Sequence, residues 1–229
     1  MFTSLESQRR IGRIAWYSAW VALVLGQLHA LSRFATEDGK EDLDLPLTGA
    51  WAEPAGKALR PLLDWAGPDT VYLTYGKVWF PLFLAFTLCA FVVRRRRQAV
   101  GFEKWAWRVA LLGYVWGAVG TFCDYWTQWA DPNAFFDIAF VITIPGLLLT
   151  MIGSTMLGTA LLRNGFRPKV SAWLLTAAVP GLLLISEVTS LGNTALPIMF
   201  AFGIVGRRIA REPSYAVDVS STSLLVEHA

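Results

Sequence analysis

Long stretches without a charged side chain decide which folds are open to this chain of 229 residues. A helix needs about 20 mostly apolar residues to cross the hydrocarbon core of a membrane. The stretches 14–32 and 138–162 contain no Asp, Glu, Lys or Arg at all. Charged residues make up 16% of the chain and its mean hydropathy is +0.45, whereas about a quarter of a soluble domain is charged. The sequence therefore excludes a soluble globule, a disordered chain and a disulfide-stapled domain, and it predicts an all-α integral membrane protein.

The apolar stretches predict a single transmembrane domain, residues 14–211, built as a six-helix bundle. The predicted spans cover about 14–32, 71–93, 106–130, 136–162, 170–189 and 193–206. The turn-like sequence Ser190-Leu191-Gly192-Asn193 separates the last two spans. A five-helix bundle is the alternative, if the last segment enters and leaves the membrane on the same side.

The basic residues predict how the bundle is oriented. With residues 1–13 in the cytoplasm, fifteen of the 20 basic residues and only five of the 17 acidic residues lie on the inner side. Such a bias is typical of a plasma (inner) membrane protein, here with both termini cytoplasmic. The run Arg94–Arg97 directly follows a span, which favours an anchor at lipid headgroups over nucleic-acid binding. We expect a disordered cytoplasmic tail at 212–229.

One sizeable loop, 33–70, is predicted to lie outside the membrane. It begins with an acidic stretch, 37–44, and continues with an amphipathic piece that Pro61 interrupts. We predict one or two short helices at the outer interface, anchored by Trp51 and Trp65. The loop is either a lid over an external cavity or a plain connector, and the connector is favoured.

Three of the ionisable residues that lie within predicted spans are His29, Asp124 and Glu187. A rise of about 1.5 Å per residue puts them about 22, 27 and 25 Å from the inner ends of their helices, which is the outer third of the bundle. His29 and Asp124 each end a stripe of small residues at helical spacing, a pattern typical of close helix packing. The stripes are Ala15, Ala19, Ala22 and Gly26 before His29, and Ala106, Ala110, Gly113, Gly117 and Gly120 before Asp124.

These residues predict a polar pocket that opens to the outside. His29, Asp124 and Glu187 would line it as a ligand or ion pocket, because charged groups in a span normally face the bundle interior or a water-filled cavity. The rim would carry Arg33, Lys77 and Asp137. The alternative is a structural network in which His29 or Lys77 pairs with an acid and locks helices together.

Motifs for specific chemistry are sparse. A metal held by His29, Asp124 and Glu187 stays open, because imidazole and carboxylate ligands suit zinc, iron or manganese, although no short ligand motif supports it. No nucleotide-binding loop, dinucleotide fingerprint or CxxC motif indicates a cofactor. Cys89 and Cys123 are predicted at opposite depths, which excludes a disulfide between them.

The C-terminal third carries a resemblance. The sequence Leu161-Leu162-Arg163-Asn164-Gly165-Phe166-Arg167-Pro168-Lys169, followed by Trp173-Leu174-Leu175, resembles a loop-and-helix pattern of uncharacterised multi-pass membrane proteins of bacteria, especially actinobacteria. The resemblance implies a bacterial inner membrane protein and brings no activity with it.

The functional expectation is a non-enzymatic protein that binds or passes a small solute, ion or lipid through the outer pocket. Two alternatives stay open. The chain would be an accessory or assembly subunit of a larger membrane complex, or a homo-oligomer, docking through its small-residue stripes. Otherwise it would be a membrane-embedded enzyme that uses the same His, Asp and Glu cluster.

Overall fold

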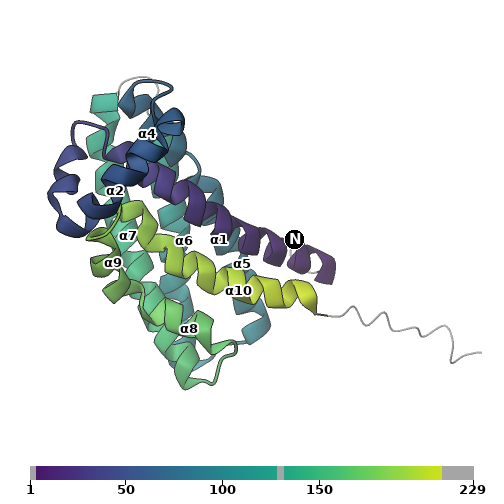
Figure 1. Ribbon diagram of the computed structural model, residues 1–229. Coiled ribbons are helices and arrows are strands. Elements are labelled where there is room, and N and C mark those ends of the chain that lie inside the picture. The colour runs from purple at the N-terminus through teal and green to yellow at the C-terminus, as the bar shows by residue number, and fades with distance from the viewer. Residues whose placement is uncertain (1–3, 128–131, 213–229) are drawn as a thin grey trace, which may run out of the picture.

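A computed structural model describes residues 4–127 and 132–212, and within 132–140 it describes the backbone alone. The described residues are helical throughout, without a strand (Figure 1). The α-helices are α1 (Leu5–Arg33), α2 (Pro46–Ala58), α3 (Arg60–Leu63), α4 (Pro68–Gly76), α5 (Trp79–Arg97), α6 (Gly101–Trp126), α7 (Pro132–Arg163), α8 (Lys169–Thr176), α9 (Ala178–Ser186) and α10 (Leu196–Arg211). Two short 3₁₀ helices are η1 (Lys40–Asp44) and η2 (Leu191–Ala195). The all-α prediction is confirmed for this part of the chain.

Among the described residues, three helical segments are long and apolar enough to cross a membrane: Leu5–Arg33, Pro68–Arg97 and Val141–Arg163. The pair α8 and α9, bent by 61°, makes a fourth if it forms one broken span. Of the other two predicted spans, α10 has only 16 residues, and the Gly, Tyr and Trp residues of α6 lower its mean hydropathy. The chain thus has the helices of a membrane-associated protein, while the six-span bundle stays a prediction.

Helices α1 and α10 lie side by side along most of their length (Figure 1). They approach closely because glycines face each other where they cross, and a Cβ atom added at Gly12 or Gly206 would meet the backbone of the other helix. Further along, Gly203 of α10 packs against Ala15 and Ala19 of α1. The small-residue stripe of α1 is buried along its whole length, so its prediction as a packing face is confirmed.

Helices α6 and α7 form the other extensive contact of the bundle. A Cβ atom at Gly113 would meet the backbone at Leu149 and Thr150, and one at Gly117 would meet the ring of Phe83. The small residues of the α6 stripe from Ala106 to Gly120 are all buried. This stripe therefore serves contacts within the chain, as its spacing predicts.

The predicted external loop, 33–70, folds into a helical layer at one end of the bundle, made of η1, α2 and α3, which we call the cap; α4 follows it and belongs mostly to the predicted span 71–93. Leu59 ends α2 just before Pro61, so the break falls where the sequence predicts it. Two side chains of α2 fasten the cap to the turn after α9: Thr48 donates a hydrogen bond to the carbonyl of Glu187, and Trp51 donates to that of Val188. Trp51 thus anchors the cap to the protein.

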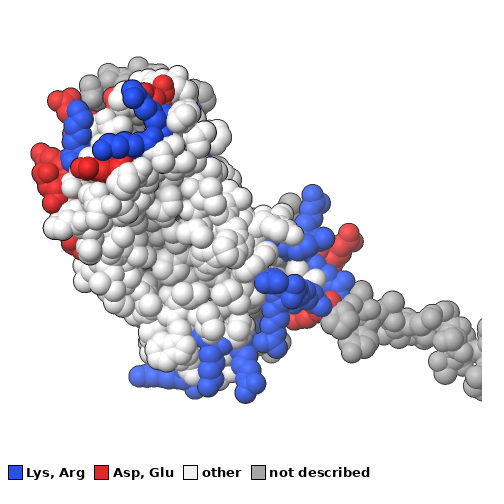
Figure 2. Space-filling model, in the orientation of Figure 1, with Lys and Arg blue, Asp and Glu red and all other residues white. Residues whose placement is uncertain are grey.

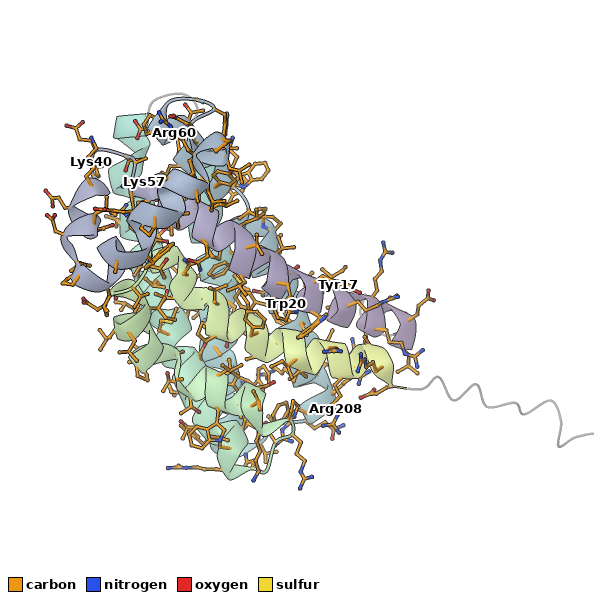
Figure 3. All side chains as sticks on the ribbon, viewed as in Figure 1. Tyr17, Trp20, Lys40, Lys57, Arg60 and Arg208 are labelled. Carbon is orange, nitrogen blue, oxygen red and sulfur yellow. The ribbon has the colours of Figure 1, made fainter. Side chains whose placement is uncertain are left out.

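Charged side chains gather at the two ends of the molecule, with an uncharged band between them (Figure 2). Lys40, Lys57 and Arg60 lie on the cap, among most of the acidic groups seen in this view (Figure 3). The opposite end, which we call the arginine end, is mainly basic and carries Arg208 (Figure 3). Tyr17 and Trp20 are exposed in the band between, as expected of side chains that face lipid.

A buried carboxylate ties three helix ends together at the arginine end. Glu103 at the start of α6 is 4% exposed and accepts hydrogen bonds from Arg97 of α5 and from Asn164, which follows α7. Burial by itself raises the pKa of Glu103, but these hydrogen bonds and the charge of Arg97 outweigh it, so the pKa lies below its ordinary value. Glu103 lies outside the predicted span 106–130.

We expect Glu103→Gln to destabilise the protein at pH 7 by about 1–3 kcal/mol, because it weakens charge-assisted hydrogen bonds in a buried network. The folded-state pKa is the lower one, so this stabilisation is complete above the unfolded pKa and is lost as the pH falls through the folded one. Thermal unfolding in mild detergent should show the gap between wild type and variant closing toward acid pH. Lys104→Gln, at an exposed neighbour, is the control and should show no such change.

The glycine contact between α1 and α10 gives a second prediction. Gly12→Ala should destabilise the protein by about 1–3 kcal/mol, because its methyl group has no room against Gly206. Gly56→Ala in α2 meets nothing within 4 Å and should be neutral or slightly stabilising. The measurement is the thermal midpoint of the two variants in the same detergent. Equal midpoints would contradict the close packing.

Candidate functional site

A cavity of about 350 Å³ lies at the cap end of the bundle, where the cap meets the long helices. Its lining is largely apolar, with polar groups supplied by nearly every element that reaches this end. Among the polar lining residues are Arg33 of α1, Asp42 of η1, Tyr72 of α4, Asp124 of α6, Thr150 of α7 and Ser190 before η2. The size and the mixture of surfaces are those of a small-molecule pocket.

An irregular stretch of backbone forms one wall of the cavity. Helix α9 ends at Ser186, the chain turns through Thr189 and Ser190, and η2 begins at Leu191. These residues all line the cavity. In a membrane protein, non-helical backbone is tolerated where it is buried in protein or lines a water-filled cavity. The turn joins α9 to η2 and α10 at the cap end, and it brings polar groups to the cavity wall.

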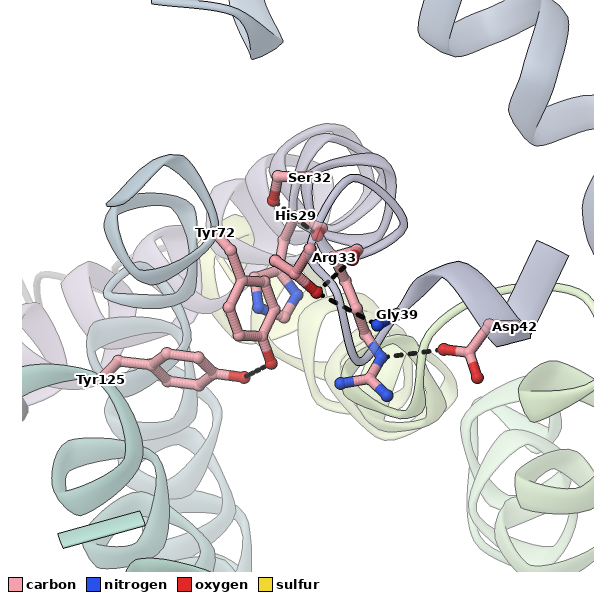
Figure 4. A network of polar contacts seen from close by, with 8 residues as sticks. His29, Ser32, Arg33, Gly39, Asp42, Tyr72 and Tyr125 are labelled. Atoms are coloured by element: carbon pink, nitrogen blue, oxygen red, sulfur yellow. Dashed lines mark hydrogen bonds and ion pairs between the residues drawn. The ribbon is translucent and has the colours of Figure 1, made fainter. Parts of the chain in front are cut away.

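His29 lies in the cavity wall within a cluster of aromatic rings. Its imidazole stacks on Tyr72 at a centroid distance of 4.7 Å and meets Tyr125 edge-on at 5.3 Å. The hydroxyl groups of Tyr72 and Tyr125 lie 3.4 Å apart, as the close view shows (Figure 4). His29 is 1% exposed, so these rings hold it in one orientation.

A hydrogen bond from Trp79 sets the protonation of His29. The indole nitrogen of Trp79 lies 3.2 Å from Nδ1 of His29, and an indole N–H can only donate. Nδ1 must therefore accept, which places the proton of the neutral imidazole on Nε2. His29 is thus a neutral donor whose Nδ1 lone pair is already used, and this role suits ligand binding better than proton abstraction.

Arg33 lies one helical turn after His29 on the same face of α1. Its Nε donates to Asp42 of η1 at 2.9 Å, and its backbone carbonyl accepts from Thr36, whose hydroxyl in turn accepts from the amide of Gly39 (Figure 4). The pair brings η1 of the cap into the cavity wall. The cap therefore takes part in the candidate site, as the lid interpretation requires and a plain connector does not.

Asp124 forms part of the α6 wall of the cavity. Its Oδ1 accepts a hydrogen bond of 2.8 Å from Thr143 of α7, which also lines the cavity. The next residue, Tyr125, contacts His29. Asp124 and His29 are therefore brought to one cavity, as the two small-residue stripes predict.

The other predicted site residues fall elsewhere. Glu187 is wrong as a lining residue: its side chain is exposed and only its backbone contacts the cap. The sequence prediction assumes one straight helix. Helices α8 and α9 are bent by 61° and α9 ends at Ser186, so Glu187 faces another direction. Lys77 does not line the cavity, and its backbone carbonyl accepts from Trp126. The side chain of Asp137 lies outside the described residues.

Sequence reasoning missed Tyr72 and Trp79, which define the surroundings of His29. Tyr72, Gly76 and Trp79 follow the spacing 4 and 3, and the structure places all three on the side of α4 and α5 that meets the bundle. The same period that revealed the stripes of α1 and α6 would have revealed this face. Aromatic rings at that spacing were not recognised as the partners of His29.

Three buried polar atoms of residues in the cavity wall have no hydrogen-bond partner: Nε2 of His29, Oγ1 of Thr150 and Oγ of Ser190. An unpaired buried donor or acceptor costs about 1–3 kcal/mol. Three of them around one cavity are therefore expensive unless a bound molecule or water satisfies them.

The donor set does not fit the metal alternative. The described residues contain no group of three or more His, Cys, Asp or Glu side chains placed to hold a metal ion. A metal-bound imidazole normally donates its other ring N–H, whereas Nδ1 of His29 accepts from Trp79. With Glu187 on the surface, the predicted trio does not meet.

Comparison with known proteins adds no function to this geometry: no protein-family model, no curated protein and no solved structure matches the chain. Function is therefore inferred from the cavity.

The environment of His29 makes a direct prediction. At pH 7 the ring should be neutral and protonated on Nε2, which nitrogen NMR of labelled histidine detects. Only one other histidine, His228, is present, so His228→Gln isolates the signal. Trp79→Phe removes the donor to Nδ1 and should let both neutral tautomers appear. Signals of the Nδ1–H tautomer in the parent would contradict the assigned hydrogen bond.

Proposed function

We propose that the protein binds a small solute, or passes it across the membrane, through the cavity that His29, Arg33 and Asp124 line. The carrying observation is a cavity of about 350 Å³ whose largely apolar wall gathers polar groups from α1, η1, α6 and the turn before η2. An apolar cavity with a few convergent polar groups is the usual form of a small-molecule site.

The geometry favours a binding site over the structural ion-pair network. His29 is hydrogen-bonded to Trp79 and Asp124 to Thr143, so neither is paired with a charge through these contacts. Within the described residues, the ion pair in the cavity wall is Arg33 with Asp42, which joins the cap to α1. A locking network would instead pair charges between long helices.

We further propose a plasma-membrane location with six spans, both termini cytoplasmic and the cap outside. The support is the charge distribution: the ends of α1, α5 and α10 at the arginine end carry ten of the 20 basic residues, and the cap gathers acids. On the positive-inside rule the arginine end faces the cytoplasm, and the cavity opens outward.

The accessory-subunit and enzyme alternatives have less to support them. The small-residue stripes that would dock a partner are buried against helices of this same chain. The imidazole that a hydrolytic site would use as a base has its Nδ1 lone pair occupied by Trp79. Both alternatives remain hypotheses without a specific observation in their favour.

The test uses two neighbouring leucines of α7. Leu147 lines the cavity, whereas Leu148 is 49% exposed. Leu147→Trp should fill the cavity, and Leu148→Trp should add the same bulk on the outer surface. Native mass spectrometry of gently purified protein should show a stoichiometric small molecule in wild type and Leu148→Trp, and its loss in Leu147→Trp.

Two outcomes would contradict the proposal. If Leu147→Trp retains the molecule as fully as Leu148→Trp, the ligand lies outside this cavity. If the wild-type protein carries no small molecule in its own membrane extract, the cavity is not a binding site of useful affinity. Equal thermal midpoints of the two variants would show that the loss does not come from unfolding.

A further inference from the structure

A second concave surface lies at the arginine end, far from the cavity. It is lined by Pro168, which precedes α8, and by residues at the end of α10: Ile204, Arg207, Arg208, Arg211 and, directly after the helix, Glu212. This basic groove has a volume of about 540 Å³. Arg208, one of these residues, lies at the arginine end (Figure 3).

The charge of the groove is positive because its acid is already engaged. The carboxylate of Glu212 pairs with Arg96 at 2.7 Å, and its backbone carbonyl accepts from Arg9. Arg207 lies over the ring of Trp16 at 4.7 Å and is held there. By contrast, no contact of the Arg208 or Arg211 side chain occurs within the described residues, and both are exposed.

An apolar surface adjoins these guanidinium groups. Ile204, one turn before Arg208 on α10, is half-buried in the groove. On α8, Val170 is 58% exposed and Trp173 is 61% exposed, close to Pro168 in the chain. A Trp exposed beside basic residues at the end of an apolar band is typical of the membrane–water interface. The groove thus offers two free cations next to a surface suited to acyl chains.

We propose that the basic groove binds the phosphate headgroup of an anionic phospholipid, with Arg208 and Arg211 as its ligands and an acyl chain along Ile204 and Val170. Guanidinium groups pair with phosphate oxygens through two parallel hydrogen bonds, and two of them suit one headgroup. Basic pockets between helices at a membrane surface are a known means of selecting anionic lipids. This site is independent of the cap-end cavity and of its ligand.

The experiment measures lipid retained by the full chain. The protein is reconstituted with equal amounts of phosphatidylglycerol and phosphatidylcholine of the same acyl chains, extracted gently, and examined by native mass spectrometry. Wild type should retain phosphatidylglycerol selectively. Arg208→Gln with Arg211→Gln should weaken that retention on the order of tenfold, because it removes both free guanidinium groups.

A matched control separates a built site from general attraction to a basic surface. Arg10→Gln with Arg13→Gln removes the same charge from exposed positions of α1 at the same end, outside the groove. This control should change retention less than twofold. All four positions are exposed, so thermal midpoints should stay near wild type in both double variants.

Three results would overturn the proposal. Equal loss in the two double variants would mean diffuse attraction to the arginine end. Equal retention of phosphatidylcholine and phosphatidylglycerol would mean that charge does not select the lipid. Displacement of phosphatidylglycerol by inorganic phosphate or a short oligonucleotide, at matched ionic strength, would assign the groove to a soluble phosphate ligand.

Discussion

The close approach of helices through small residues is the constraint on which the rest of this structure depends. Lipid tails are as apolar as leucine, so helices in a membrane gain little from hiding apolar side chains and associate through tight packing. Gly12 against Gly206, and Gly113 against the backbone of α7, bring helix axes together along two long contacts. These contacts carry His29 and Asp124 on their last turns, so the same packing that holds the bundle also aims two polar side chains at one cavity.

The cap end combines an irregular turn of backbone with unpaired polar atoms on residues of one cavity wall. The turn from Glu187 to Ser190 interrupts helical hydrogen bonding, and two of its carbonyl groups are satisfied by side chains of α2. Three unpaired polar atoms lie nearby in the cavity wall. The cap is thus held to the turn by side-chain hydrogen bonds, and to α1 by the Arg33–Asp42 pair and by a buried apolar cluster of Ala30, Leu31, Phe34 and Ala52.

Much of the fold could be predicted from the sequence, because spacing records which side of a helix is packed. The stripes ending at His29 and Asp124 predict that both residues face the interior of the bundle, and the structure brings both to one cavity. Glu187 was wrong for a physical reason: its depth and face were calculated on a straight helix, whereas α8 and α9 bend by 61° at Ala177. The sequence does carry a signal for this break: Pro180 has no N–H to bond the carbonyl of Thr176, so a helix cannot continue unbroken through this stretch. The aromatic surroundings of His29 were missed because Trp79 reaches it from another helix.

Charged side chains are paired differently at the two ends of the molecule. At the cap end, charge is matched inside the protein, Arg33 with Asp42, so that His29 contributes a neutral donor within an aromatic wall. At the arginine end, Arg96 pairs with Glu212 and Arg97 with Glu103, while no acid among the described residues pairs with Arg208 or Arg211. A band without charged side chains separates the ends (Figure 2). On our two proposals, the cavity selects its ligand by hydrogen bonding and shape, whereas the groove selects by charge.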